Sequence, residues 1–340
     1  MASIDVAVPC YQYERFLRDS VGSILRQGVD NLRVLIIDNA STDNSVEVAL
    51  QLASEDARVS VCAHPTNLGS QVSYNEAIDW ASADYFMIVD ADDVLAPGCL
   101  ARSIAVLEQH PNAVLACGHE QTLSFAAGEP PPCSPDDGEA SWTIVPSQAM
   151  LEELFRDVTC VATTTIVRRT DVQKKIGYFR KEVLLADDLE MWLRLAAAGD
   201  IARTNATQAI RRLHGDRLTE AYQRAAVYYF VQRHIAFASF FKHEGSSMPN
   251  AKHLQRQVRS KLAKEALWFG LDSVKRGQEK RGARLVDFAL QLAPAVAAPR
   301  LAKGVWQLDR PLNRLAGFVK ASVVGALRGT GGIQFAEDES

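Results

Sequence analysis

The sequence lacks paired cysteines, a long apolar run and a leader-like beginning. Its six cysteines include no CxxC pair, so neither a zinc site nor a disulfide framework is expected and the thiols are expected to stay reduced. The apolar stretch 315–327 is too short to span a bilayer and contains Lys320. No basic stretch followed by an apolar run opens the sequence, so no signal peptide is expected. These absences favour a cytoplasmic protein.

The sequence also lacks a strong excess of charge of either sign. It carries 37 basic and 41 acidic residues, a net charge of −4, and a nucleic-acid partner is therefore not expected. The 47% hydrophobic and 23% charged fractions are those of an ordinary globular protein. With 340 residues the chain exceeds one average domain, which predicts one large α/β unit and an appended piece.

Short runs rich in β-branched or aromatic residues alternate with helix-like segments over the first part of the sequence. Strands are predicted at residues 4–8, 34–37, 59–62 and 85–89. Helices are predicted at residues 13–27, 45–54 and 70–81. This alternation predicts βαβ units and a mostly parallel sheet, in which ligands bind beyond the carboxyl ends of the strands. Polar residues follow each strand, and we expect them to meet there, at 9–11, 38–43, 65–69 and 90–93.

The second part of the sequence is less regular and then becomes helical. Strands are predicted at 114–123, 163–168 and 201–213, helices at 147–155 and 188–198, and a proline-rich loop at 128–138. From about residue 219 the pattern is helical throughout, with apolar stripes at 254/258/262, 285/288/289/292 and 308/312/315/319. Gly270, Gly277 and Pro294 are expected to separate these helices.

The predicted strand 85–89 leads directly into Asp90, Ala91 and Asp92. Side chains two positions apart in an extended segment share a face, so the two carboxylates offer together the hard oxygen ligands that Mg²⁺ and Mn²⁺ prefer. Such a cation offsets the negative charge that builds on a diphosphate leaving group. The alternative is that Asp92 or Asp93 only caps the helix or turn around Pro97.

Asp38 closes the predicted strand 34–37. A carboxylate only accepts hydrogen bonds, so Asp38 suits the N–H of a pyrimidine ring. The residues that follow it, 41–43, are expected to be structural and to form the N-cap of the helix at 45–54.

A second acidic pair, Asp187 and Asp188, stands at the start of a predicted helix. One of the two is expected to cap this helix or complement its dipole. The other is a candidate general base that removes a proton from an acceptor hydroxyl, and the alternative is that both only cap. His214 ends the last extended segment, either as a third metal ligand or phosphate donor or as a plain surface histidine.

In this order the motifs resemble the large family-2 glycosyltransferases of the GT-A fold. The resemblance covers roughly residues 1–220, and His214 falls where many members keep a histidine. Two positions depart from the pattern: Asn39 and Ala40 stand where the family often has Asp and Gly, and Asp187 stands where it usually has Glu. The matching segments are 8–11 with 23–27, 37–43, 67–69 with Asn75, 90–93 and 187–194.

The resemblance implies a mixed, mostly parallel Rossmann-like sheet flanked by helices, with an α-helical C-terminal extension. It implies a nucleotide-sugar-binding half at 1–118, an acceptor-binding half at 119–220 and a helical region at 221–335. The implied activity is an inverting, metal-dependent transfer from a UDP, GDP or dTDP sugar to a hydroxyl of a saccharide or glycoconjugate, in bacterial polysaccharide or glycoconjugate biosynthesis. The implied cofactor is Mn²⁺ or Mg²⁺.

The resemblance also implies a role for each matching residue. Asp188 is the catalytic base, and Asp187 and Trp192 lie on the acceptor side. The metal is held by Asp92 with Asp90 and His214. The nucleotide sugar is bound by Pro9, Tyr11 and Asp38, which hold the base, and by Asn67, Asn75, Asp90 and Ala91.

Three other activities compete with this interpretation. A sugar nucleotidyltransferase normally has a Gly-rich basic loop after the first strand, where this chain has residues 9–15 without glycine. A nucleotide-sugar-binding protein without transferase activity is disfavoured because both acidic motifs are intact. A dinucleotide-dependent oxidoreductase is disfavoured because no GxGxxG follows the first strand.

Two interpretations of the C-terminal helices stay open. Residues 300–328 carry six Lys or Arg residues against Asp309 alone, so these helices are candidates for peripheral association with the inner face of an anionic membrane. Alternatively they pack on the catalytic domain or on a second subunit in a homodimer.

Overall fold

The computed structural model describes residues 2–129, 140–214 and 226–305. The chain divides into two compact units, Met1–Asp216 and Arg217–Ser340. Each unit has a hydrophobic core of its own. Every residue with a predicted role in the site lies in the first unit.

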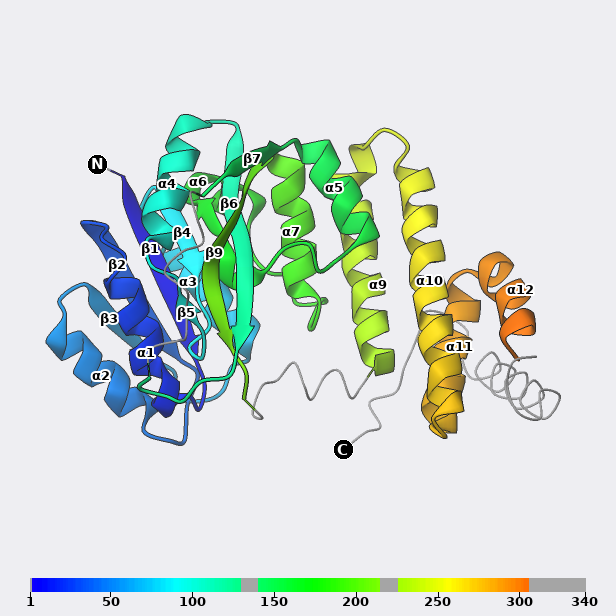
Figure 1. The fold of residues 1–340 in the computed structure, drawn as a ribbon, viewed down its shortest axis with the longest axis horizontal. Coiled ribbons are helices and arrows are strands. Elements are labelled where there is room, and N and C mark those ends of the chain that lie inside the picture. Colours follow the sequence, from blue (N-terminus) through cyan, green and yellow to red (C-terminus); the bar gives the residue numbers. More distant parts are fainter. Residues whose placement is uncertain (1, 130–139, 215–225, 306–340) are drawn as a thin grey trace. The chain divides into compact units, whose positions relative to one another are not determined.

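In the first part of this unit, strands and helices alternate as the sequence predicts (Figure 1). The elements are β1 Ser3–Cys10, α1 Glu14–Leu25, β2 Asn31–Asp38, α2 Ser45–Glu55, β3 Val59–Ala63, α3 Ser70–Trp80 and β4 Tyr85–Ile88. They are followed by β5 Val94–Leu95, α4 Cys99–Gln109, β6 Ala113–Leu123, β7 Trp142–Val145, α5 Ser147–Arg156, β8 Val167–Arg169, α6 Thr170–Ile176, α7 Asp187–Ala198 and β9 Asp200–Arg212.

These strands form one mixed sheet in the order β3-β2-β1-β4-β8-β6-β9-β5, with β7 paired to β9. The pairings make β1, β2, β3, β4, β6 and β9 run in one direction and β5, β7 and β8 in the other. The expected mixed, mostly parallel sheet flanked by helices is confirmed. Strand β1 lies between β2 and β4, and its Ile4 pairs with Leu32 of β2 and with Tyr85 of β4.

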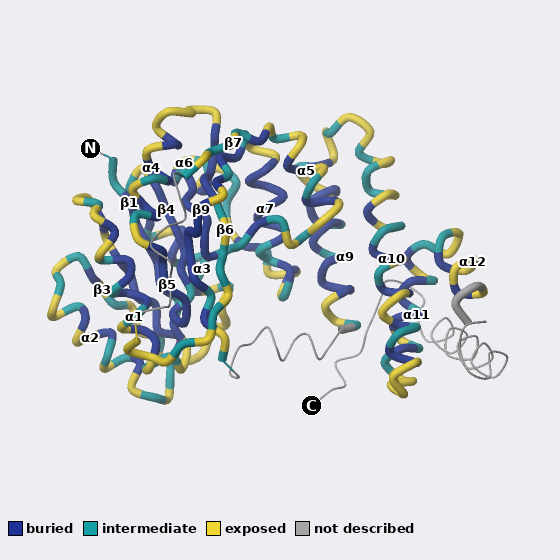
Figure 2. Tube along the Cα trace, in the orientation of Figure 1, coloured by how far each residue is buried: buried dark blue, intermediate teal, exposed yellow. Residues whose placement is uncertain are grey.

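The core of the first unit lies between the sheet and its helices. In α1, Leu17, Val21 and Ile24 are fully buried because their three- and four-residue spacing places them on one face. They pack in the same cluster as the buried side chains of β1. Figure 2 shows β1 and β4 as buried along most of their length.

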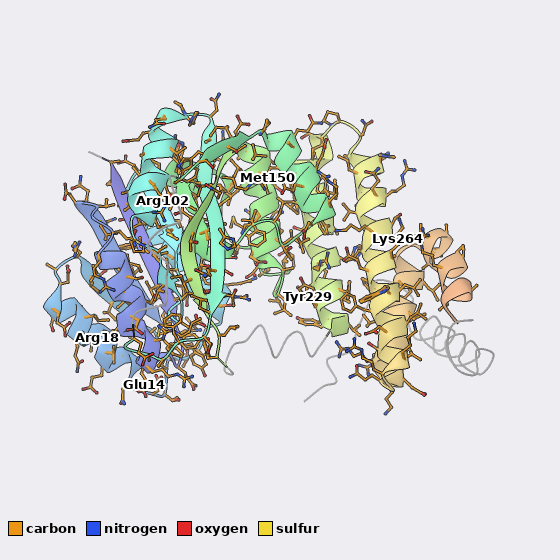
Figure 3. The ribbon with its side chains drawn as sticks, in the orientation of Figure 1. Glu14, Arg18, Arg102, Met150, Tyr229 and Lys264 are labelled. Atoms are coloured by element: carbon orange, nitrogen blue, oxygen red, sulfur yellow. The ribbon has the colours of Figure 1, made fainter. Side chains whose placement is uncertain are left out.

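Helix α4 is joined to strand β9 by polar contacts as well as by packing. Arg102 of α4, labelled in Figure 3, donates to the carbonyl oxygen of Thr207 at 2.7 Å and to Gln208 Oε1 at 2.6 Å. Both partners belong to β9. Helix α4 therefore anchors the long strand that leads toward His214.

Several elements differ from the sequence prediction. The predicted strand at 163–168 begins as a 3-10 turn, Thr163–Thr165, and only its end enters β8. A run of three threonines resembles a strand, but Thr165 Oγ1 bonds the carbonyl oxygen of Ala162 and supports the turn. The pattern did not predict α4, α6, β5 or β7, and the two strands are too short for periodicity to show them.

The described part of the second unit, residues 226–305, is helical, as predicted. Its α-helices are α9 Ala226–Lys242, α10 Ala251–Lys275, α11 Glu279–Leu292 and α12 Pro294–Val305. The predicted stripe on α11 is fully confirmed, since Leu285, Phe288, Ala289 and Leu292 are buried in the helical core.

Gly270 does not separate two helices, contrary to the prediction, because it lies inside α10. A Cβ on Gly270 would stand 3.0 Å from the carbonyl oxygen of Gly282 in α11, so the missing side chains let the two helices approach closely. Gly277 does separate α10 from α11 and adopts φ 78°. The predicted stripe at 308–319 and most of the proline-rich loop lie outside the described residues. Over the parts of the chain that the structure describes, no helix is both long and apolar enough to cross a membrane.

Candidate active site

Four strands deliver the predicted site residues to one edge of the sheet. Since β1, β2, β4 and β9 run in the same direction, their carboxyl ends meet there. Tyr11 follows β1, Asp38 ends β2, residues 90–93 follow β4, and His214 follows β9 (Figure 1).

The turn after β4 gathers three carboxylates. One carboxylate oxygen from each of Asp90, Asp92 and Asp93 lies within 4.8 Å of the others. Asp93 N–H donates to the carbonyl oxygen of Asp90 at 3.1 Å, which closes the turn. Neither Asp92 nor Asp93 caps a helix, because α4 begins only after Gly98 and has no side-chain cap. The alternative that either residue caps α4 is therefore wrong.

Such a cluster fits a divalent cation by its chemistry. Asp92 is 4% exposed and Asp93 1% exposed, so their charges are held close together away from bulk water. Hard carboxylate oxygens are the ligands that Mg²⁺ and Mn²⁺ prefer. Asp93 also has a structural task, since its Oδ1 accepts the N–H of Arg212 at 3.1 Å.

His214 is not a plain surface histidine. Its Nε2 lies 2.9 Å from Asp92 Oδ2, and its side chain is only 9% exposed. The imidazole packs against Phe16 and Tyr13 of the α1 region, with ring centroids 4.7 Å and 5.8 Å away. The histidine is therefore held beside the acidic turn.

Arg212 contacts the acidic turn through its Nε, which donates to the carbonyl oxygen of Asp92 at 3.3 Å, and this contact was not predicted. Its side chain is 1% exposed, and its Nη2 donates to Asp19 Oδ2 at 2.8 Å. A further bond reaches the carbonyl oxygen of Ala126 at 2.9 Å, and the guanidinium lies 3.9 Å from the Phe125 ring centroid. A charged residue at the end of an otherwise buried strand was the one sequence signal available.

Asp38 is buried beneath the loop that follows β2. It is 1% exposed, and its two carboxylate oxygens accept from the N–H and the hydroxyl of Ser41 at 2.9 Å and 2.5 Å. Each oxygen has a second lone pair, so Asp38 still has capacity to accept a bond from a ligand. Ala40 in this loop has φ 61°, a left-handed conformation that favours glycine.

Residues 41–43 are structural, although not as the predicted N-cap. The cap position of α2 is Asn44, whose side chain makes no capping bond. Asp43 instead accepts from the N–H and hydroxyl of Ser45 at 3.1 Å and 2.6 Å and from Glu14 N–H at 3.1 Å. These bonds join the starts of α1 and α2.

Three further residues were predicted to bind the nucleotide sugar. They lie at the same edge of the sheet or support it. Pro9 lies inside β1 and pairs with Ile37, whereas Tyr11 is 39% exposed just beyond the strand. Asn67 Oδ1 accepts from Gly69 N–H and Asn39 Nδ2, both at 2.9 Å. The Asn67 side chain therefore organises its own loop.

The second acidic pair opens α7. Asp187 Oδ1 accepts Asp188 N–H at 3.0 Å, and Asp188 Oδ1 accepts Leu189 N–H at 2.6 Å. Burial, followed by the charge of Asp188, raises the pKa of Asp187 to about 7. Burial raises the pKa of Asp188 to about 6. Both carboxyls therefore titrate near neutral pH, which suits a group that exchanges protons with substrate.

Helix α3 holds this acidic pair through one of its faces. Gln71 Nε2 donates to Asp187 Oδ2 at 3.1 Å and also to the carbonyl oxygen of Val183. One turn later Asn75 exchanges two bonds with the backbone of Phe179, at 2.8 Å and 3.2 Å. Positions 71, 74 and 75 share a face of the helix. Sequence reasoning assigned Asn75 to the nucleotide sugar and did not predict its contact with Phe179.

Tyr74, on the same face, connects the two acidic groups. Its ring lies 5.2 Å from that of Phe179. Burial raises the pKa of Tyr74 well above its usual range, and the charges of Asp90, Asp187, Asp188 and Asp92 raise it further. Carboxylates from the turn after β4 and from the start of α7 are therefore both near enough to Tyr74 to act on its pKa.

Trp192 and Ala91 lie in the interior. Trp192 is 8% exposed and Ala91 fully buried. In the same helix as Trp192, Glu190 forms ion pairs with Arg194 at 2.8 Å and with Arg180 at 2.5 Å. Arg194 also donates to the carbonyl oxygen of Tyr178 at 2.8 Å, so this buried network fixes the segment before α7.

Comparison with known proteins identifies relatives among glycosyltransferases. An uncharacterized glycosyltransferase of Haemophilus influenzae is 23% identical over 233 residues, which cover 64% of this chain and 68% of that protein. Chondroitin synthase of Pasteurella multocida is 25% identical over 213 residues, which cover 63% of this chain and 21% of that much longer protein.

Solved structures share the fold. S. aureus TarS 1–349 in complex with UDP-GlcNAc superposes with a TM-score of 0.66 at 15% identity, covering 99% of this chain and 98% of that one. The mannosyltransferase PcManGT of Pyrobaculum calidifontis, in complex with GDP-Man and Mn²⁺, gives a TM-score of 0.55 at 16% identity and covers 96% of this chain and 87% of that one. The expected GT-A fold is confirmed. The family model for glycosyl transferase family 2 matches residues 5–177, and the chain belongs to that family.

Proposed function

We propose that this glycosyltransferase moves a sugar, with inversion, from a UDP, GDP or dTDP sugar to a hydroxyl of a saccharide or glycoconjugate. The observation that carries the proposal is that charges of both acidic groups, Asp90 and Asp92 as well as Asp187 and Asp188, act on the pKa of one residue, Tyr74. It supports a cation-binding turn and a candidate base within one site. The bound UDP-GlcNAc and GDP-Man of the two structural neighbours support a nucleotide-sugar donor.

Asp188 is the proposed catalytic base. Its oxygen accepts the proton of the acceptor hydroxyl while that hydroxyl oxygen bonds to the anomeric carbon of the donor sugar. The bond from this carbon to the diphosphate oxygen breaks, and its electron pair leaves with the diphosphate. A carboxyl with a pKa of about 6 is largely ionised at neutral pH, yet basic enough to take a proton.

The acidic turn is the proposed metal site. Asp92, with Asp90 and His214, would hold Mn²⁺ or Mg²⁺, which supplies charge compensation for the departing diphosphate. The Mn²⁺ in the structure of PcManGT supports such a cation. Asp38 and Tyr11, with Pro9, are the proposed contacts of the nucleotide base. Asp187 is the proposed contact of the acceptor. Its Oδ2 already accepts a hydrogen bond from Gln71.

The acceptor class is proposed from the relatives. Chondroitin synthase supports a role in bacterial polysaccharide or glycoconjugate assembly. Peripheral membrane association and a homodimer remain predictions, because most of the basic segment 300–328 lies outside the described residues. Flotation of the full chain with anionic and with neutral vesicles tests the membrane prediction, and equal flotation with both would contradict it.

The decisive experiment separates donor binding from turnover. The full chain is first screened by thermal shift against a panel of nucleotide sugars with Mn²⁺ or Mg²⁺, and the stabilising donor is used in a transfer and hydrolysis assay. Asp188→Asn is expected to bind this donor as the parent does and to lose turnover by about 10²–10⁴-fold. The matched control Asp272→Asn changes a surface carboxylate of α10 and is expected to keep the parent rate.

Two results would contradict the proposal. Transfer at the parent rate by Asp188→Asn would exclude this residue as the base. Donor binding without transfer or hydrolysis by the parent would favour a binding protein, and release of diphosphate from a nucleoside triphosphate and a sugar phosphate would favour a nucleotidyltransferase.

A further inference from the structure

A second cluster of metal-binding side chains lies away from the acidic turn. One ligand atom from each of Cys62, His64 and Glu76 lies within 4.8 Å of the others. Cys62 belongs to β3, His64 follows that strand, and Glu76 lies in α3. Cys62 and His64 are two positions apart in an extended segment, so their side chains share a face.

The hydrogen bonds around His64 fix where its proton lies. His64 Nδ1 is 3.1 Å from Asn39 Oδ1. This oxygen also accepts Leu68 N–H at 2.8 Å, while Asn39 Nδ2 donates to Asn67 Oδ1 at 2.9 Å. Because the amide of Asn39 is oriented by these two bonds, its oxygen can only accept from His64, and Nδ1 carries the hydrogen.

This leaves Nε2 of a neutral His64 as an acceptor that faces another acceptor. Glu76 Oε2 is 2.6 Å from it. Two acceptors at this distance share one proton, and a metal ion that replaces this proton would take both side chains as ligands. The thiol of Cys62 lies beside the same pair, and burial followed by the charge of Glu76 raises its pKa.

We propose that Cys62 Sγ, His64 Nε2 and the Glu76 carboxylate form a binding site for Zn²⁺ or a similar thiophilic divalent ion. Sulfur, imidazole and carboxylate are the ligands that Zn²⁺ takes, and three protein ligands with one open position are typical of accessible zinc sites. The open position is available because Cys62 is exposed and the Glu76 side chain is 41% exposed. On binding, the thiol proton passes to solvent and the thiolate bonds the metal.

The asparagine behind His64 completes the site. A metal-bound histidine usually donates its other N–H to a fixed acceptor, which orients the ring. Asn39 Oδ1 is such an acceptor, and the same asparagine binds Asn67 in the loop beyond β3. A metal at this site would therefore hold the end of β3, helix α3 and that loop together. It differs from the acidic turn in its ligands, which include a thiolate.

Co²⁺ titration of the full chain, reduced with a phosphine, tests the site without reference to sugar transfer. A thiolate-bound Co²⁺ shows a near-ultraviolet charge-transfer band that carboxylate-bound Co²⁺ lacks. We expect this band to saturate with one Co²⁺ and to disappear on addition of Zn²⁺. It is expected to be lost in Cys62→Ser and in His64→Ala, and Asn39→Ala is expected to weaken Co²⁺ binding by about 10–100-fold.

Two matched controls keep the band if the proposal is correct. Cys160→Ser removes another partly accessible thiol, and Asp92→Asn changes the acidic turn. Absence of the band in the parent would overturn the proposal and leave a hydrogen bond between His64 and Glu76 as the whole of this contact. Retention of the band in Cys62→Ser would overturn it equally. Cys62 is exposed, so this variant is expected to fold, and Glu76→Gln gives a second test should His64→Ala not fold.

Discussion

His214 Nε2 contacts Asp92 Oδ2 at 2.9 Å although 122 positions separate the two residues. The contact joins the end of β9 to the turn after β4 and places an imidazole beside the most enclosed pair of carboxylates in that turn. We therefore propose that His214 either ligates a metal bound at this turn or orients Asp92 for it.

Substitution of either residue is expected to weaken metal binding. Asp92→Asn removes one of three carboxylate charges, and His214→Ala removes the group that holds Asp92 in place. We expect His214→Ala to weaken Mn²⁺ binding by about 10–100-fold, and Asp92→Asn to lower both Mn²⁺ binding and metal-stimulated transfer. Electron paramagnetic resonance of free Mn²⁺ measures the binding, with Asp272→Asn as control. Unchanged Mn²⁺ binding by both variants would remove the acidic turn as the metal site.

The rate of transfer is expected to fall on acidification. Asp188, the proposed base, has a pKa of about 6 and can accept a proton only when it is ionised, and its neighbour Asp187 has a pKa of about 7. As the pH falls through these values both carboxyls take up protons, so log kcat should decrease between about pH 8 and pH 5. Steady-state kinetics at saturating donor and acceptor measure this decrease of kcat.

Gln71→Leu tests the cause of that pH dependence. The hydrogen bond from Gln71 lowers the pKa of Asp187, against the larger effect of burial. Loss of this bond should therefore shift the decrease of kcat on acidification to higher pH. A kcat that is independent of pH over the same range, in parent and variant alike, would contradict the assignment of this pair.

Asn75 is expected to position the acidic pair, because both ends of its amide are bonded to Phe179. Asn75→Leu leaves the N–H and carbonyl of Phe179 without these partners, which costs about 1–3 kcal/mol of stability. We expect a lower melting temperature and a lower kcat with an unchanged donor Kd. A raised donor Kd with unchanged stability would instead support the direct contact with nucleotide sugar that family resemblance implies.

Ala40→Gly is expected to stabilise the protein. Ala40 adopts φ 61°, and an L-residue in this conformation costs about 1–2 kcal/mol, whereas glycine adopts it freely. The greater freedom of glycine in the unfolded chain offsets about 0.5–1 kcal/mol of that gain. Differential scanning calorimetry should therefore show a small rise in Tm. Ala63→Gly, in strand β3, serves as control and should lower Tm; a fall in both variants would contradict the expectation.

The regular part of the fold could be predicted because the spacing of its apolar residues reflects the local backbone conformation. Strands β1 to β4 are short apolar runs, and α1 to α3 carry apolar faces at helical spacing, so the alternation and the parallel sheet followed. The prediction was wrong at Thr163–Thr165, where β-branched residues form a 3-10 turn held by a bond to Ala162. No local property of three threonines distinguishes that turn from a strand.

The sequence by itself determined which chemistry is present: carboxylates at the end of β4 and at the start of α7, and a histidine after β9. Only the tertiary structure decided which groups share a space. The effect of both acidic groups on Tyr74, the bond from Arg212 to the acidic turn, and the closeness of Cys62 to Glu76 all depend on the approach of distant segments. Such contacts are set by strand order and helix packing, which no local pattern along the chain encodes.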